Sequence, residues 1–504
     1  MKKLFFAVLL VSISQLVSAQ SPKIKAKKYP SLFWEITGNG LKKPSYLFGT
    51  MHVSSKMAFF LSDSFYIALK QADVVSLETN PESWQADMDK YDLGNNDYTD
   101  GMYRSADGEY ISYPQDYLYK SSLAIDRYDK LMEQALYMQP SVINNLLYRN
   151  YSSYSSDFEE DTYLDLYIYQ TGKKLGKQIT GVEQYGESMR LMMEANSDAA
   201  SEKNRRSRSY DIDDDLRPGN LQEAYRSGNL DWLDSINKAN SESEAFDAKF
   251  IYRRNEIQAN SMDSIMKHSS LFVGVGAAHL PGDKGVIELL RKKGYTLRPI
   301  MMRKRDYKQK EMADRMRVPV KFSGQTSTDG FYKVNVPGKL YSYGNSGLIR
   351  QSQYADMANG SYYMVTRLKT EGLFWGEPEE GVLKKVDSML YENVPGKILS
   401  KISITKNGYK GFDITNKTRR GDWQRYNIFV TPFELVIFKI SGTGEYIRTG
   451  EEANRFFGSI QLKEPGETRW SVWQPVYGGF RAAFPHAPFV FINGEREYEA
   501  ADRS

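Results

Sequence analysis

Two stretches decide the fold of this chain: Tyr46-Leu47-Phe48-Gly49-Thr50-Met51-His52 and Leu271-Phe272-Val273-Gly274-Val275-Gly276-Ala277-Ala278-His279. Each is a short apolar segment, typical of a buried strand, that ends in Gly-x-x-His. Glycine at the end of a strand permits a tight turn or a close backbone approach. In open α/β sheets, ligands bind at the carboxyl ends of the strands. The chain has only four histidines, and we therefore predict that His52 and His279 belong to one site.

Strand and helix patterns alternate around these stretches. Apolar strand patterns occur at 34–36, 45–48, 73–78, 178–183, 271–273 and 295–300. Helical periodicity occurs at 65–72, 117–138, 142–148, 162–169, 221–226, 230–241, 245–268 and 285–293. A helix between strands indicates a β-α-β unit and a parallel sheet. We therefore predict an α/β domain over residues 30–302.

The remainder of the chain has a different pattern. A basic segment at 303–318 is interpreted as a solvated linker helix. Over 319–464, strand patterns surround two helical stretches, which predicts an α+β module with an antiparallel sheet. The pattern aromatic-x-x-x-x-Pro at 332–337 recurs at 480–485. We therefore expect 465–504 to be a tail or the start of a further module in a longer natural product.

Composition limits the classes of partner and the cellular location. The chain has 504 residues, with 67 Lys and Arg against 63 Asp and Glu. This balance gives no indication of a nucleic-acid partner. Lys2 and Lys3, an apolar run and Val17-Ser18-Ala19 predict a signal peptide at 1–19, hence export to the periplasm or secretion. No later apolar run is long enough to predict a transmembrane anchor in the mature chain.

Cysteine is absent from the sequence. Disulfides and thiolate ligands are therefore excluded, and an exported chain of this kind is typical of a bacterial envelope. Any metal site must use His, Asp, Glu, Asn or water.

Glu78 and Glu183 end predicted strands and are the carboxylates that could complete a histidine pair. Imidazole and carboxylate donors suit Mn²⁺, Co²⁺, Zn²⁺ or Fe²⁺. Such an ion lowers the pKa of bound water to about 7, and a second carboxylate can then act as general base. Arg254 and Asn255 could orient a substrate carbonyl or stabilise its developing charge. Taken singly, each residue also fits a structural role, namely a satisfied strand-end histidine, an ion pair or a solvated helix face.

The same residues resemble the TraB/PrgY/GumN family, whose relatives include the Tiki metalloproteases. The similarity covers about 30–302 and includes Leu47 to Val53, Ala68 to Glu78, Leu164-Asp165, Gly181-Val182-Glu183, Arg254-Asn255 and Val273 to Gly282. The resemblance implies an EreA/ChaN/Tiki-like domain with two related halves around a mixed sheet. It also implies a divalent-metal peptidase activity, known for some relatives, with His52, Glu78 and His279 in the metal positions. The C-terminal module resembles PsbP/Mog1-like modules.

We therefore predict an exported metal-dependent hydrolase, a peptidase that uses a metal-activated water on a peptide or protein substrate. The predicted ligands are His52, His279 and Glu78, and the ion is Mn, Co or Zn. The predicted catalytic residues are Glu78, Glu183, Arg254 and Asn255. The alternative is a non-catalytic protein of the same family that binds a peptide, a pheromone or an envelope component.

Overall fold

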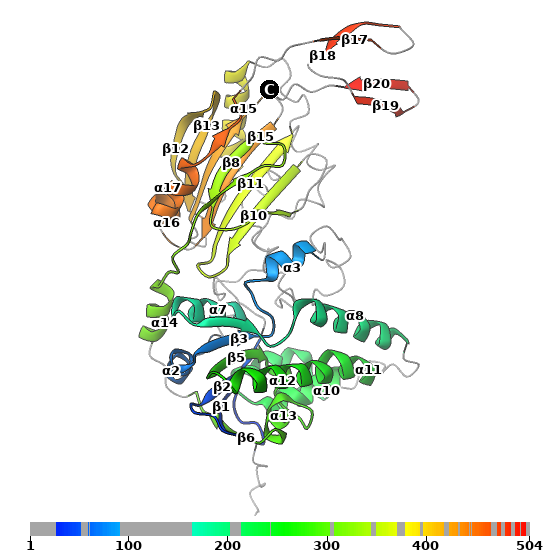
Figure 1. Ribbon diagram of the computed structural model, residues 1–504, viewed down its shortest axis with the longest axis vertical. Coiled ribbons are helices and arrows are strands. Elements are labelled where there is room, and N and C mark those ends of the chain that lie inside the picture. Colours follow the sequence, from blue (N-terminus) through cyan, green and yellow to red (C-terminus); the bar gives the residue numbers. More distant parts are fainter. Residues whose placement is uncertain are drawn as a thin grey trace, which may run out of the picture.

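The fold comes from a computed structural model (Figure 1). It describes residues 27–51, 59, 61–90, 164–201, 213–241, 243–302, 307–343, 349–369, 378–393, 397–417, 423–431, 434–442, 444, 446–464, 471–474, 479–484, 489–493 and 495–499. The predicted signal peptide, the predicted helices at 117–138 and 142–148, and His52 lie outside the described residues. Within the described part, no helix is long and apolar enough to cross a membrane.

A six-stranded mixed sheet forms the N-terminal part. Its strand order is β4-β3-β5-β2-β1-β6. The bounds are β1 Phe33–Gly38, β2 Ser45–Thr50, β3 Val74–Leu77, β4 Gln178–Gly181, β5 Leu271–Gly276 and β6 Tyr295–Ile300. The four strands from β4 to β2 are parallel. At the edge, β1 pairs antiparallel with β2, and β6 pairs antiparallel with β1. The predicted α/β class is confirmed at this level.

The two quoted stretches form neighbouring strands. β2 and β5 pair in parallel, and Thr50 lies opposite Gly276. Gly274 allows a helix to approach β5 closely, because a Cβ there would lie 2.9 Å from Ile168 Cδ1 and 3.2 Å from Leu77 Cδ2. The glycine pattern therefore serves packing on the sheet as well as the turn that follows it.

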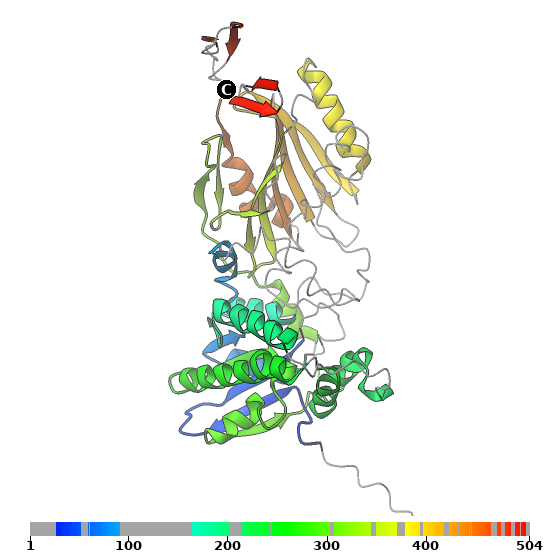
Figure 2. The same ribbon diagram turned by 90° about the vertical axis from the view of Figure 1, so that its right-hand side faces the viewer.

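Helices cover both faces of this sheet (Figure 2). The helices of this part are α2 Asp63–Gln71, α7 Leu164–Lys174, α8 Tyr185–Ser201, α9 Leu221–Arg226, α10 Leu230–Asn240, α12 Arg254–Met266 and α13 Val286–Lys292. The helix predicted at 245–268 is not continuous. It is divided into α11 Glu244–Asp247, a π-helical segment Ala248–Arg253 and α12. A π-helical turn widens the backbone locally and is frequent at functional sites.

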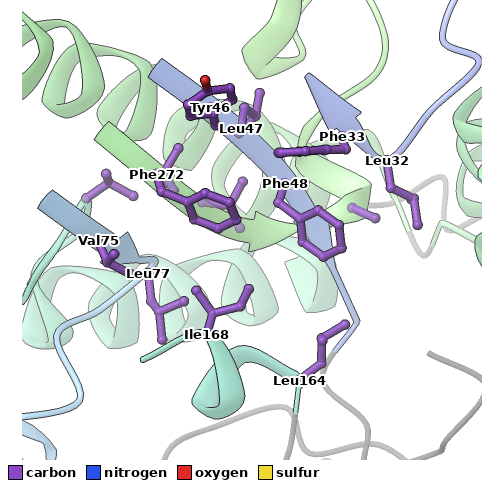
Figure 3. Packing of buried hydrophobic residues seen from close by; sticks show 14 of the residues in the cluster. Leu32, Phe33, Tyr46, Leu47, Phe48, Val75, Leu77, Leu164, Ile168 and Phe272 are labelled. Atoms are coloured by element: carbon purple, nitrogen blue, oxygen red, sulfur yellow. The ribbon is translucent and has the colours of Figure 1, made fainter. Parts of the chain in front are cut away.

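Aromatic side chains pack together where β1, β2, β5 and α2 meet. Figure 3 shows three of them, Phe33, Phe48 and Phe272, on neighbouring strands. Phe33, Phe48, Phe65 and Phe272 are at most 1% exposed. The rings of Phe48 and Phe272 each lie 5.2 Å from the ring of Phe65 in edge-on contact. Large buried rings contribute strongly to stability, and truncation of one typically costs about 3–5 kcal/mol. This packing holds the two Gly-x-x-His strands in register.

The C-terminal part contains a seven-stranded antiparallel sheet, which agrees with the predicted antiparallel pattern. Its order is β12-β13-β14-β15-β11-β10-β9. The bounds are β9 Tyr341–Tyr343, β10 Ile349–Asp356, β11 Ser361–Lys369, β12 Lys397–Lys406, β13 Tyr409–Lys417, β14 Trp423–Val430 and β15 Glu434–Gly442. A smaller sheet adds β7 Ser323–Thr326, β8 Tyr332–Val336 and β16 Gln461–Leu462. The accompanying helices are α15 Glu379–Asn393, α16 Tyr446–Thr449 and α17 Glu451–Gly458.

The predicted linker contains the helix α14 Tyr307–Arg315. After residue 464, two hairpins follow, formed by β17 Ser471–Trp473 with β18 Ala482–Phe484 and by β19 Phe489–Asn493 with β20 Glu495–Glu499. Figure 1 shows them at the end of the molecule opposite the six-stranded sheet.

The end of β10 and the turn that follows it contact the N-terminal part. In helix α3, Trp84–Lys90, the amide of Gln85 donates to Ala355 O at 3.0 Å and accepts from Ala355 N at 2.9 Å. Gln170 of α7 donates to Met357 O at 2.8 Å. Figure 1 shows α3 between the two large sheets. The buried side chains of Ala355, Met357 and Ala358 also belong to the N-terminal core.

Gly181 offers a test of the packing at the end of β4. A Cβ there would lie 2.7 Å from Asn80 N and 3.0 Å from Thr79 C, both backbone atoms that follow β3. We expect Gly181→Ala to lower the free energy of unfolding by about 1–3 kcal/mol in urea, because backbone atoms must shift. Gly219→Ala is the control, since its Cβ would meet nothing within 4 Å. Equal stability of the two variants would contradict this packing.

Candidate functional site

The candidate site lies where the parallel strands β2, β5 and β3 end. Glu78 directly follows β3, and His279 ends a 3₁₀ turn, Ala277–His279, that directly follows β5. Gly49 lets this turn lie against β2, because a Cβ there would be 3.2 Å from Ala277 Cβ and 3.1 Å from Leu280 Cδ2. Strands that run in one direction bring their carboxyl ends to a common edge. The sequence therefore positions Glu78 and His279 side by side.

Glu78 connects three elements. Its Oε1 accepts a hydrogen bond from the backbone N–H of Gly276 at 2.7 Å and lies 3.7 Å from His279 Nε2. Its Oε2 accepts from Arg254 Nη2 at 2.7 Å. The side chain is 15% exposed. The carboxylate thus faces the end of β5 with one oxygen and α12 with the other.

Asn255 determines which tautomer the His279 ring adopts. The Asn255 amide nitrogen donates to Lys284 O at 2.8 Å, which directs its Oδ1 to His279 Nδ1 at 2.7 Å. An amide oxygen only accepts, so Nδ1 carries the hydrogen. In the neutral imidazole, Nε2 then keeps its lone pair, and this atom faces Glu78. His279 is 5% exposed.

Arg254 lies between the two glutamates. Its Nη2 donates to Glu78, and its Nε donates to Glu183 Oε2 at 2.9 Å. Its side chain is 10% exposed. Burial alone would lower the pKa of Arg254, but the charges of Glu78 and Glu183 outweigh burial and raise it. Arg254 is the first residue of α12, directly after the π-helical segment.

Glu183 is buried and lies beyond the strand that it was predicted to end. Strand β4 ends at Gly181, so Glu183 lies on the connection to α8 and not in the strand. Oε1 accepts from Gln258 Nε2 at 2.5 Å, and Oε2 accepts from Arg254 and from Ser188 Oγ. The side chain is 2% exposed. Both oxygens are therefore directed to protein donors.

The structure thus brings together Glu78, Glu183, Arg254, Asn255 and His279. It adds Gln258 and Ser188, which the sequence analysis did not identify. Gln258 lies one helical turn after Arg254, and this spacing was the available signal. Ser188 lies in α8, and only the fold relates it to Glu183.

The described residues do not include a complete set of metal ligands. No group of three or more His, Asp or Glu side chains there could hold an ion. The two described donors that face each other are Glu78 Oε1 and His279 Nε2. Thr50, two residues before His52, lies opposite Gly276 in the ladder.

Comparison with known proteins identifies the N-terminal part. The model of the TraB/PrgY/gumN family matches residues 32–299. No protein with a curated description matches the chain.

Solved structures match mainly over shorter segments. A protein of unknown function from Pseudomonas aeruginosa, described as a putative regulator, is 11% identical over 26% of this chain and 90% of its own, with a TM-score of 0.18. Cyanobacterial PsbP from Synechocystis is 10% identical over 29% of this chain and 94% of its own, with a TM-score of 0.22. A Bacteroides thetaiotaomicron protein is 11% identical over 30% and 53%, with a TM-score of 0.18. At these TM-scores the matches support no inference about this chain.

The ion pairs of Arg254 allow a test with its neighbour as control. We expect Arg254→Met to lower the free energy of unfolding by about 3–5 kcal/mol, because two buried carboxylates lose their cation. The side chain of Arg253, the last residue of the π-helical segment, is 55% exposed and pairs with Glu256. Arg253→Met should change stability by less than about 1 kcal/mol. Urea unfolding measures the stability of both variants. Similar losses would show that the ion pairs of Arg254 stabilise the fold no more than the exposed pair of Arg253 does.

Proposed function

Since the chain belongs to the TraB/PrgY/gumN family, we propose that it is an exported metal-dependent hydrolase that cleaves peptide bonds. The observation that supports this most directly is the pair Glu78 Oε1 and His279 Nε2, 3.7 Å apart. The proposal includes an EreA/ChaN/Tiki-like domain, in which the two Gly-x-x-His motifs belong to two related halves. Export to a bacterial envelope rests on the N-terminal signal pattern.

The described donors fit a divalent ion. Two atoms that each lie about 2.0–2.2 Å from one ion are separated by at most about 4.4 Å, and the Glu78–His279 distance is within this limit. Glu78 and Glu183 with Arg254 leave one net negative charge, which favours a cation. Glu78 and His279 would hold the ion, with His52 as third ligand by its motif. Mn, Co or Zn suits this set.

The bound ion would supply hydroxide from water at neutral pH. Asn255 and Arg254 would have separate roles around the ion. Asn255 keeps His279 in the tautomer that offers Nε2, as partners of metal-binding histidines commonly do. Arg254 fixes the orientation of Glu78 and presents positive charge next to the site. Partial burial of Glu78 and His279 strengthens these interactions, because the surroundings are less polar than water.

Metal content tests this proposal. The purified chain should bind one equivalent of Zn²⁺, Co²⁺ or Mn²⁺ and cleave members of a peptide library, and a chelator should abolish cleavage. His52→Ala and His279→Ala should each lose the metal, because each removes a ligand. His268→Ala is the matched control, since this exposed histidine follows the end of α12. Elemental analysis and calorimetric titration measure binding, and full metal content in His279→Ala would refute the ligand assignment.

One observation favours a second function, the binding of a peptide or envelope component without turnover. Both oxygens of Glu183 are held by Arg254, Gln258 and Ser188, so this carboxylate is poorly placed to accept a proton from water. A protein of this kind would bind a peptide with the chelator present and cleave no member of the library. Cleavage that requires metal would exclude this alternative.

A further inference from the structure

We propose that the outer edge of strand β12 binds an extended acidic peptide segment of another protein, which adds to the seven-stranded sheet as a further strand. The preferred segment has acidic residues near both ends and apolar residues between them. This edge belongs to the C-terminal part of the chain, so its binding is independent of the function proposed for the N-terminal part.

β12 is the terminal strand of the seven-stranded sheet (Figure 1). It is ten residues long, Lys397–Lys406, and each of its residues is exposed or half-buried. Within the described part of the chain it pairs with β13 on one side, and its outer side meets no described strand. The backbone N–H and C=O groups along such an edge form a template for pairing with another strand.

Two large apolar side chains of this strand are exposed. Leu399 is 41% exposed and lies at a β-bulge, and Ile402 is 59% exposed. Bulges and lysines on an edge strand protect it against unspecific pairing, and β12 has both. Protection does not require exposed apolar side chains, whereas an edge that binds a peptide uses side-chain contacts to select its partner. Burial of these two side chains by an added strand would stabilise the complex.

The hairpin formed by β12 and β13 is strongly basic. Residues 397–417 contain five lysines and one acidic residue, Asp413, which leaves four net positive charges. The formal net charge of the whole chain is also +4. Asp413 accepts hydrogen bonds from Arg425 Nε at 3.1 Å and Arg425 Nη2 at 2.7 Å, so its charge is compensated within the sheet. The hairpin therefore favours an acidic partner.

The lysines gather at the two ends of this hairpin. Lys397 lies opposite Lys417 at one end, and Lys406 and Lys410 lie beside the turn at the other end. The lysine between them, Lys401, pairs with Asp387 of α15. At about 3.3 Å per residue, β12 spans about 30 Å. An extended peptide of about the same length, with glutamates at both ends, would match this distribution of charge.

A second copy of β12 fits this edge less well than an acidic peptide does. In an antiparallel pair centred on the strand, Lys397 of each copy would approach Lys406 of the other. Like charges opposite each other destabilise a pair of strands, and opposite charges stabilise it. The positions of the lysines thus favour a partner of opposite charge over self-association.

The experiment measures the fluorescence anisotropy of a labelled peptide, Glu-Glu-Val-Thr-Val-Thr-Val-Glu-Glu, with the full chain at low salt. Replacement of both threonines of the peptide by proline should weaken binding about 10-fold or more, because proline cannot donate to a strand ladder. Replacement of its glutamates by lysines should abolish binding, because attraction becomes repulsion. These two peptides separate strand pairing from attraction between charges.

A double variant of the chain tests the charges of the edge. Lys397→Glu with Lys406→Glu should weaken binding of the glutamate peptide about 10-fold or more, because two attractive pairs become repulsive. The matched control is Lys42→Glu with Lys333→Glu, which changes the net charge equally at two exposed lysines outside this hairpin. The control should keep wild-type affinity.

A second substitution tests the apolar contact. Ile402→Thr retains a β-branched side chain but removes apolar area, and should weaken binding about 3- to 10-fold. Val472→Thr is its control, because Val472 is a 72% exposed apolar residue in β17, outside the seven-stranded sheet. Urea unfolding verifies that each variant is folded. If the double charge variant does not fold, the comparison of Ile402→Thr with Val472→Thr decides.

Equal affinity for the proline peptide would overturn the inference, because binding would then need no strand ladder. An equal loss in the Lys42 and Lys333 control would also overturn it, since the effect would then be one of total charge. Absence of any anisotropy change with the wild-type chain would have the same meaning. A dimer in sedimentation that is lost in Ile402→Thr would assign the edge to a second copy and would likewise overturn the proposal.

Discussion

The parallel pairing of β2 with β5 is the constraint on which the rest of the structure depends. It joins segments from opposite ends of the N-terminal part and places Thr50 opposite Gly276. Two glycines make this pairing compatible with its surroundings. Gly49 lets the turn to His279 pack against β2, and Gly274 lets α7 approach β5. The backbone N–H of Gly276 then donates to Glu78. A larger side chain at Gly49 or Gly274 would require Ala277, Leu280 or Ile168 to shift.

The charges at this edge are arranged so that none is buried alone. Arg254 contacts both glutamates, and Glu183 is further held by Gln258 and Ser188. A buried carboxylate without such partners would be strongly destabilising. Glu183 therefore sets the position of Arg254, and Arg254 in turn sets the orientation of Glu78. This order connects a deeply buried residue two positions beyond β4 with the carboxyl edge of the sheet.

Much of the site could be predicted from sequence because it depends on local rules. Strand-end glycines followed by histidine, and a strand ending at Glu78, predict a common edge whenever the strands are parallel. The family similarity, confirmed over residues 32–299, pointed to the same residues. The sequence could not show that Glu183 is enclosed, because its partners Ser188 and Gln258 come from helices whose packing is a long-range property. The break in the helix predicted at 245–268 was also missed, because this stretch contains no glycine or proline that would signal an interruption.

The junction at α3 has a consequence for any attempt to divide the chain. Gln85 holds the backbone of Ala355 in both directions, and Met357 and Ala358 are buried in the N-terminal core. A fragment that stops near residue 302 would present these apolar and amide surfaces to water. The helix that would lose its support begins only a few residues after Glu78. Fragments designed for crystallisation should therefore retain the β10–β11 hairpin, even when only the candidate site of the N-terminal part is to be studied.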